Sequence, residues 1–80
     1  MTREAILKEL EVIFQDIFDD EDIVLTEATN SDDIEDWDSL EQINLLVAIE
    51  KKFSLKFKLD EVAKLADVGD MVSLIEKLLG

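Results

Sequence analysis

Residues 36–53 read Asp-Trp-Asp-Ser-Leu-Glu-Gln-Ile-Asn-Leu-Leu-Val-Ala-Ile-Glu-Lys-Lys-Phe, and this stretch carries the clearest helix signal of the chain. Asp38 is a short side-chain acceptor with Glu41 three residues later, which is the pattern of a capping box at the start of a helix. Apolar residues then recur at helical spacing: Leu40, Ile43, Leu46, Val47, Ile49 and Phe53. The stretch therefore predicts an amphipathic helix that begins after Asp38 and ends near Phe53.

The flanking segments predict three more helices. Thr2 is a candidate N-cap for a first helix over residues 3–18, with Glu4 in its first turn. Asp60 is expected to cap a short helix from Glu61 to about Leu65, and Asp67 to cap a last helix. The apolar stripes are Ile6, Leu7, Leu10, Ile13, Phe14, Ile17 and Phe18 in the first helix, and Val68, Met71, Val72, Ile75, Leu78 and Leu79 in the last. The predicted fold class is all-α, a small four-helix bundle with three longer helices and one short one.

Two connectors separate these helices. Residues 19–36 combine acidic and polar residues with a short apolar run, Ile23-Val24-Leu25, which we expect to anchor the segment on the core. A loop of this length in a small domain suggests a function of its own. Residues 54–59 alternate polar and apolar like a strand, but the sequence offers no partner strand, so we expect an extended connector whose apolar residues dip into the core.

The amino-acid composition excludes several classes of enzyme and metal site. The chain has 80 residues, 48% of them hydrophobic, which predicts one folded domain over residues 1–80. It has no His and no Cys, which excludes a Ser-His-Asp triad, a Cys-His nucleophile, a thiolate or imidazole zinc site and a disulfide framework. The longest apolar run, Leu45 to Ile49, is far too short for a membrane span, and the N-terminus does not resemble a signal peptide. We therefore expect a cytoplasmic protein, a monomer without catalytic residues of its own.

The net charge of −13 belongs to one stretch of the chain. Fifteen acidic residues and no Lys or Arg occur from Glu9 to Glu50, whereas six lysines follow from Lys51 onward. Such a field repels nucleic acid and anionic lipid and favours partners with basic patches. Solubility of a small protein is an equally good reason for the acidity, taken alone.

Asp38-Ser39-Leu40, midway along an acidic chain and at the start of its second helix, resembles the motif of the acyl carrier protein family, and the resemblance covers essentially the whole sequence. It implies that Ser39 carries a 4′-phosphopantetheine arm from coenzyme A, attached by a phosphopantetheinyl transferase, with Asp38 and Leu40 completing the motif. The arm would carry acyl or aminoacyl groups as thioesters between enzymes of fatty-acid, polyketide or related biosynthesis. A helix N-terminus suits the phosphodiester.

The resemblance also implies a docking face for acyl-loading and acyl-transferring enzymes with basic patches. It places recognition at Asp36, Trp37, Glu41, Ile43 and Glu50, with Asp32, Asp33 and Glu35 nearby. Asn44 and Lys51-Lys52 depart from fatty-acid carriers, which usually have acids there. Trp37 looks like the Trp-Asp-Ser-Leu variant of some carriers of specialised pathways. Trp37 packing over the helix start is an alternative, and the acids are alternatively plain solvated residues.

Two other functions are alternatives to the carrier function, a calcium site and an unmodified binding protein. An EF-hand that starts at Asn30 would place Ile34 at a ligand position and Glu35 at the glycine position, so we expect no dedicated metal site, and weak binding of divalent ions by the acidic cluster stays an open alternative. The second is an unmodified acidic helical protein that binds a basic partner as an inhibitor, a scaffold or a nucleic-acid mimic. For the carrier function, the sequence fits a fatty acyl, a polyketide or an amino-acid cargo equally well.

Overall fold

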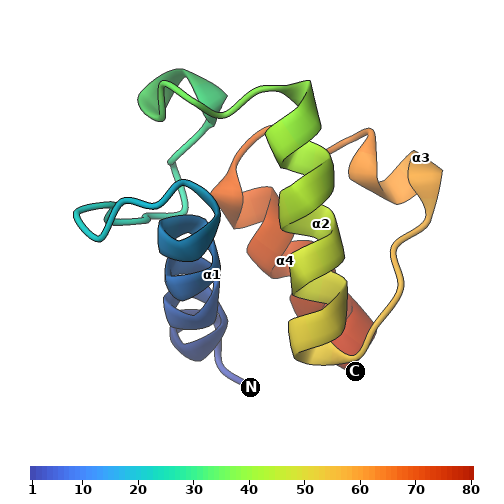
Figure 1. Cartoon of the computed structure of the whole chain (residues 1–80). Helices are drawn as coiled ribbons and strands as arrows, with labels where there is room; N and C mark the ends of the chain where they lie inside the picture. Colours follow the sequence, from blue (N-terminus) through green and yellow to red (C-terminus); the bar gives the residue numbers. More distant parts are fainter.

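The computed structural model describes all 80 residues, and it contains helices and no strands (Figure 1). The elements are α1 (Arg3–Ile17), a 3₁₀-helix η1 (Ser31–Asp33), α2 (Ser39–Phe53), α3 (Leu59–Val62) and α4 (Val68–Leu79). The all-α fold with three longer helices and one short one is confirmed. None of the helices is both long and apolar enough to cross a membrane.

The starts of the three longer helices lie where local chemistry predicts them. The Thr2 hydroxyl accepts a hydrogen bond from the Ala5 N–H at 3.1 Å, and the Asp67 carboxylate accepts one from the Asp70 N–H at 2.9 Å. The Asp38 carboxylate accepts from the Glu41 N–H at 2.9 Å. The second hydrogen bond of the predicted capping box, from the Asp38 N–H to the Glu41 carboxylate, is missing. The Glu41 carboxylate instead accepts from the Asn44 side-chain amide at 2.8 Å.

The predicted start of the short helix is wrong. α3 begins at Leu59 and ends at Val62, and Asp60 lies inside its first turn instead of capping it. The N-cap is Lys58, whose backbone N–H donates to the Glu61 carboxylate at 3.1 Å. This carboxylate satisfies the N–H of Lys58, and the Lys58 carbonyl accepts from the Glu61 N–H at 3.0 Å, so the first turn forms without a side-chain acceptor at the N-cap.

The core forms where α1, α2 and α4 meet. Its fully buried members are Ile6, Leu10 and Phe14 of α1, Leu45 and Ile49 of α2, and Val68, Val72 and Ile75 of α4. The predicted stripes of the first and last helices are thereby confirmed in their central positions. The stripe predicted for α2 is confirmed at Ile49, which is fully buried, and at Phe53, which packs against the core. It is wrong at three members, which are exposed: Leu40 by 66%, Ile43 by 58% and Val47 by 44%. At 100° per residue these three lie opposite Leu45 and Ile49, so α2 is apolar on two faces and buries only one.

The acidic loop is anchored at two places. Leu25 is buried and Ile23 packs against the core, whereas Val24 stays exposed. The carbonyl groups of Thr29 and Glu27 then accept from the N–H groups of Val68 and Gly69, at 2.8 and 2.7 Å. These bonds satisfy donors of the first turn of α4 that have no partner inside the helix. A Cβ atom at Gly69 would lie only 2.9 Å from the Glu27 carbonyl oxygen, so the close approach requires glycine there.

The second connector behaves as expected at two of its three apolar positions. Leu55 and Phe57 pack against the core, but Leu59 is 85% exposed, so its expected burial is wrong. Ser54, the residue after α2, has the left-handed conformation (φ 54°), which ends the helix and turns the chain toward α3.

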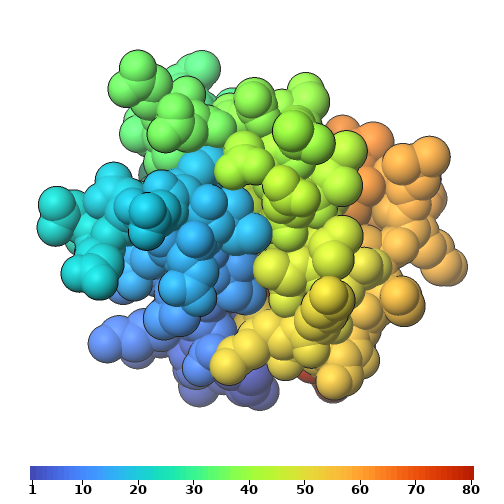
Figure 2. All heavy atoms as spheres, viewed as in Figure 1, coloured from blue at the N-terminus to red at the C-terminus, as the bar shows by residue number.

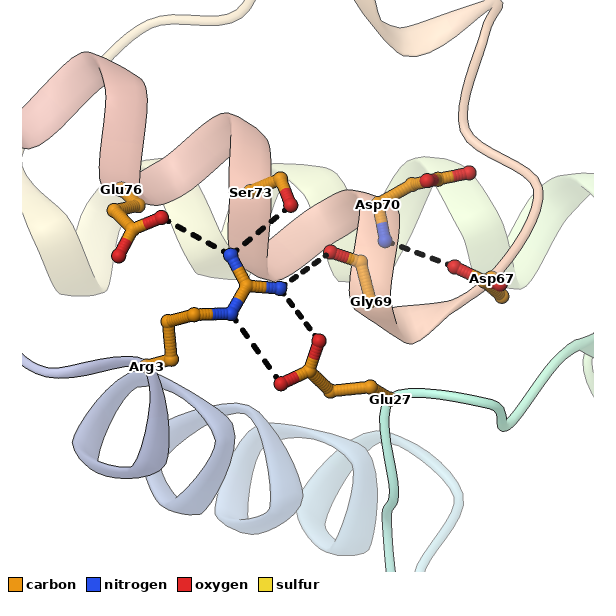
Figure 3. Close-up of polar contacts among 7 residues, drawn as sticks. All are labelled: Arg3, Glu27, Asp67, Gly69, Asp70, Ser73 and Glu76. Atoms are coloured by element: carbon orange, nitrogen blue, oxygen red, sulfur yellow. Dashed lines mark hydrogen bonds and ion pairs between the residues drawn. The ribbon is translucent and has the colours of Figure 1, made fainter.

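Arg3 links both ends of the chain to the loop (Figure 3). Its guanidinium donates to both carboxylate oxygens of Glu27, at 2.5 and 3.3 Å, and to the Glu76 carboxylate of α4 at 3.0 Å. It also donates to the Ser73 hydroxyl at 3.1 Å and, at 3.4 Å, to the Gly69 carbonyl oxygen. The hydrogen bonds from Arg3, and secondarily its charge, hold the pKa of the Glu27 carboxyl below its ordinary value of 4.5.

We expect this ion pair to make folding stability sensitive to acid. Because the pKa of Glu27 is lowered in the folded state, its contribution is fully present above pH 4.5 and is lost as the pH falls through the lowered value. Urea midpoints of the wild type and of Glu27→Gln should therefore differ at pH 7, and at a pH below 4.5 the difference should be smaller. Glu21→Gln, which removes an exposed carboxylate with no ion-pair partner, is the control and should differ little at either pH. A Glu27→Gln difference that stays constant over this range would contradict the prediction.

Candidate functional site

Ser39 is the first residue of α2 and is exposed to solvent. Its hydroxyl has no hydrogen-bond partner in the chain, whereas the neighbouring Asp38 carboxylate is held by the Glu41 N–H. The backbone carbonyl of Asp38 accepts from the Gln42 N–H at 2.9 Å and closes the first helical turn. The N–H groups of Ser39 and Leu40 are left without partners in the chain, so the positive end of the helix dipole is open beside the Ser39 hydroxyl.

A cavity of about 410 Å³ opens next to this serine. It lies between η1, the start of α2, the α3 region and the start of α4. Its wall combines polar and apolar side chains: Ser31, Trp37, Asp38, Ser39, Gln42, Val62, Leu65, Ala66, Asp67 and Met71. Ser39 thus stands at the edge of a recess with room for part of a flexible substituent.

Trp37 forms one wall of the cavity and is fixed from two sides. Its ring packs edge-to-face against the buried ring of Phe14, with centroids 5.0 Å apart and an interplanar angle of 85°. Its indole N–H donates to the Gln42 side-chain oxygen at 2.7 Å. The packing of Trp37 over the start of α2 is therefore confirmed. Gln42 was missed by the sequence analysis, although its position three residues after Ser39 places both on one side of a helix.

The predicted recognition residues are distributed along α2 and the preceding loop. Asp36 is exposed just before the helix, with Asp32, Asp33 and Glu35 also exposed, and Leu40 and Ile43 lie on the outer face of α2. Figure 2 shows α2, green to yellow, uncovered between α1 and the α3 region. Glu50 is separate from this group, about 16 Å along the helix from Ser39 at 1.5 Å per residue. Its carboxylate accepts from the Phe57 N–H at 2.8 Å and so fixes the second connector.

The chemistry available at this site is limited. The chain has no His or Cys, and no group of three acidic side chains is arranged to hold a metal ion. The carboxylate of the preceding residue, Asp38, is already an N-cap acceptor. The arrangement suits an exposed serine that accepts an anionic substituent, because free backbone N–H groups stabilise negative charge at a helix N-terminus.

Two named proteins are similar to this chain over nearly its whole length. No protein-family model matches it. The acyl carrier protein of Thermotoga maritima is 36% identical, with 99% of this chain and 98% of that protein covered. The acyl carrier protein of Exiguobacterium sp. is 34% identical over 99% of this chain and 100% of that protein.

The structural comparison gives the same result. The chain is similar to the solution NMR structure of a holo acyl carrier protein from Geobacter metallireducens, with a TM-score of 0.86 and 46% identity. That alignment covers 91% of this chain and 84% of the other. Full-length identity above 30% to named acyl carrier proteins, together with the same fold, shows that this chain belongs to the acyl carrier protein family.

Proposed function

We propose that Ser39 carries a 4′-phosphopantetheine arm and that the arm holds acyl or aminoacyl groups as thioesters. The observation that carries this proposal is the exposed Ser39 hydroxyl at the first residue of α2, beside unpaired N–H groups and a cavity. These N–H groups stabilise the phosphodiester that attachment creates. The similarity to a protein described as a holo acyl carrier protein supports the presence of the arm.

Attachment is carried out by a phosphopantetheinyl transferase. The Ser39 oxygen forms a bond to the phosphorus of the pantetheine phosphate, and the pyrophosphate bond of coenzyme A breaks and releases its nucleotide part. The transferase accepts the serine proton, because this chain has no suitable base at Ser39. The thiol at the end of the arm then supplies the sulfur that a chain without Cys lacks.

Residues 1–80 act in this proposal as one carrier domain, a monomer in the cytoplasm. Partner enzymes of fatty-acid, polyketide or related biosynthesis load the arm and take groups from it. They approach over Asp36, Trp37, Glu41, Ile43 and Glu50, with Asp38 and Leu40 flanking the attachment point. Opposite charge on the partner speeds encounter and selects the orientation.

Intact-mass spectrometry tests the attachment. The purified chain is incubated with a broad-specificity phosphopantetheinyl transferase and coenzyme A. We expect the protein to gain one arm, and only one. A chain that stays unmodified, while a known acyl carrier protein is modified in the same reaction, would contradict the proposal and favour an unmodified acidic binding protein.

The docking acids give a second prediction. Asp36→Lys with Glu41→Lys should lower the kcat/KM of arm transfer about tenfold at low ionic strength, because the encounter with a basic transferase loses its steering. Glu21→Lys with Asp22→Lys changes the net charge equally at an exposed part of the loop outside the cavity, and serves as the matched control. Equal rates for the two double variants would remove the docking role of Asp36 and Glu41.

A further inference from the structure

The uncovered face of α2 continues into two adjoining hollows. One, of about 370 Å³, lies toward α1 and is lined by Ile17, Glu41, Asn44, Val47, Ala48 and Lys51. The other, of about 470 Å³, lies at the helix end and is lined by Val47, Glu50, Lys51, Ser54, Leu55 and Lys56. Val47 and Lys51 line both. A single shallow surface therefore runs from Glu41 to Lys56, which we call the α2 groove.

The charge of the α2 groove changes sign along its length. Its beginning carries Glu41, close to the exposed acids of the loop. Its end carries Lys51 and Lys56, both exposed and neither within an ion pair. Lys52, by contrast, is neutralised by Glu9 of α1 at 3.0 Å. The one acid at this end, Glu50, is half-buried, and its carboxylate accepts from the Phe57 N–H.

The helix dipole does not account for both lysines. Lys51 lies in the last turn of α2, where a cation stabilises the helix C-terminus. Lys56 lies beyond the helix, after the left-handed turn at Ser54, and has no such partner. Two free ammonium groups that border an exposed apolar surface are instead available to a binding partner.

We propose that the α2 groove docks partner enzymes whose contact face carries both signs of charge. The face has a basic residue opposite Glu41 and an acidic residue opposite Lys51 and Lys56, and Lys51 lies about 15 Å along α2 from Glu41 at 1.5 Å per helical residue. Between them lies an apolar centre that covers Ile43 and Val47. This proposal rests on the carrier function proposed above and adds a rule for partner choice.

Like charges placed opposite each other at an interface lower the association rate and weaken the binding of wrong partners. A partner face that is basic along its whole length is attracted at Glu41 and repelled at Lys51 and Lys56. The two lysines therefore select against such enzymes, and they favour enzymes with an acid at the far end of the groove.

The test uses a malonyl-transferring enzyme of bacterial fatty-acid synthesis whose carrier-docking face is wholly basic. The substrates are malonyl-coenzyme A and this protein with the phosphopantetheine arm attached and its thiol free. We expect Lys51→Glu with Lys56→Glu to raise kcat/KM for malonyl transfer about three- to tenfold at low salt and to lose this gain at high salt. The control, Lys8→Glu with Lys64→Glu, makes the same change in net charge at residues outside the groove and should change the rate less than twofold.

In a second experiment, the basic surface residues of the enzyme are replaced one at a time by glutamate. At least one reversal should speed the reaction of the wild-type carrier and slow that of the lysine-reversed variant. If the phosphopantetheine arm is attached normally but neither the lysine reversal nor any enzyme reversal changes the rate as expected, the present proposal is overturned. The carrier function then stands. If no arm can be attached to the wild type, both are overturned together.

Discussion

Replacement of Ser39 by alanine is expected to abolish attachment of the arm completely while the protein stays folded. The hydroxyl is the only atom of this residue that can form the phosphodiester, and it has no hydrogen-bond partner in the chain. Alanine is the best helix former, and Asp38 continues to cap α2, so the structural cost of the substitution is small. Intact mass after incubation with transferase and coenzyme A measures the loss, and far-ultraviolet circular dichroism measures the fold.

Ser31→Ala is the matched control for this experiment. Ser31 lines the same cavity and is also exposed, but it lies in η1 instead of at the start of α2. The Ser31→Ala protein should gain one arm at the wild-type rate to within about twofold. An arm on the Ser39→Ala protein would show that another hydroxyl is the attachment point.

Phe14→Ala is expected to cause the largest loss of stability, about 3–5 kcal/mol for removal of a fully buried aromatic side chain. Phe14 contacts the rings of Phe18 and Trp37, with centroid distances of 5.9 and 5.0 Å. Its removal leaves a void in the core and takes away the support of Trp37, which is a wall of the cavity beside Ser39. Since small domains are stable by only about 5–15 kcal/mol, this variant should be near its unfolding threshold.

Urea unfolding followed by the fluorescence of Trp37, the single tryptophan, measures this effect. Phe14→Leu is included because it should stay folded and lose less. Val12→Ala, at an exposed position of the same helix, should change the unfolding free energy by no more than about 0.5 kcal/mol. A Phe14→Ala loss below about 1 kcal/mol would contradict the packing described for the core.

The features that could be predicted from the sequence are those that depend on near neighbours. Thr2, Asp38 and Asp67 each cap a helix through an N–H three residues later, so a few consecutive residues contain the whole interaction. The same locality made Ser39 recognisable at the start of α2. α3 was misplaced because its cap uses a glutamate inside the helix, a pattern that resembles ordinary helical sequence.

Features that depend on tertiary contacts could not be predicted. α2 is apolar on two faces, and only its packing against α1 and α4 shows that Leu45 is in the core while Leu40 and Val47 are outside. The contacts from Arg3 to Glu27 and Glu76 join residues 24 and 73 positions apart, and no local pattern announces them. The recess beside Ser39 likewise combines side chains from four parts of the chain.

Protein taken from its own growing cells shows whether Ser39 carries a thioester-bearing arm. Tandem mass spectrometry of the peptide that contains Ser39 is performed before and after treatment with neutral hydroxylamine, which cleaves thioesters. We expect a phosphopantetheine arm on Ser39 and, on part of the protein, an acyl or aminoacyl group that hydroxylamine removes. An unmodified Ser39 in all of the protein, under conditions in which the cells' other carrier proteins are modified, would contradict this expectation.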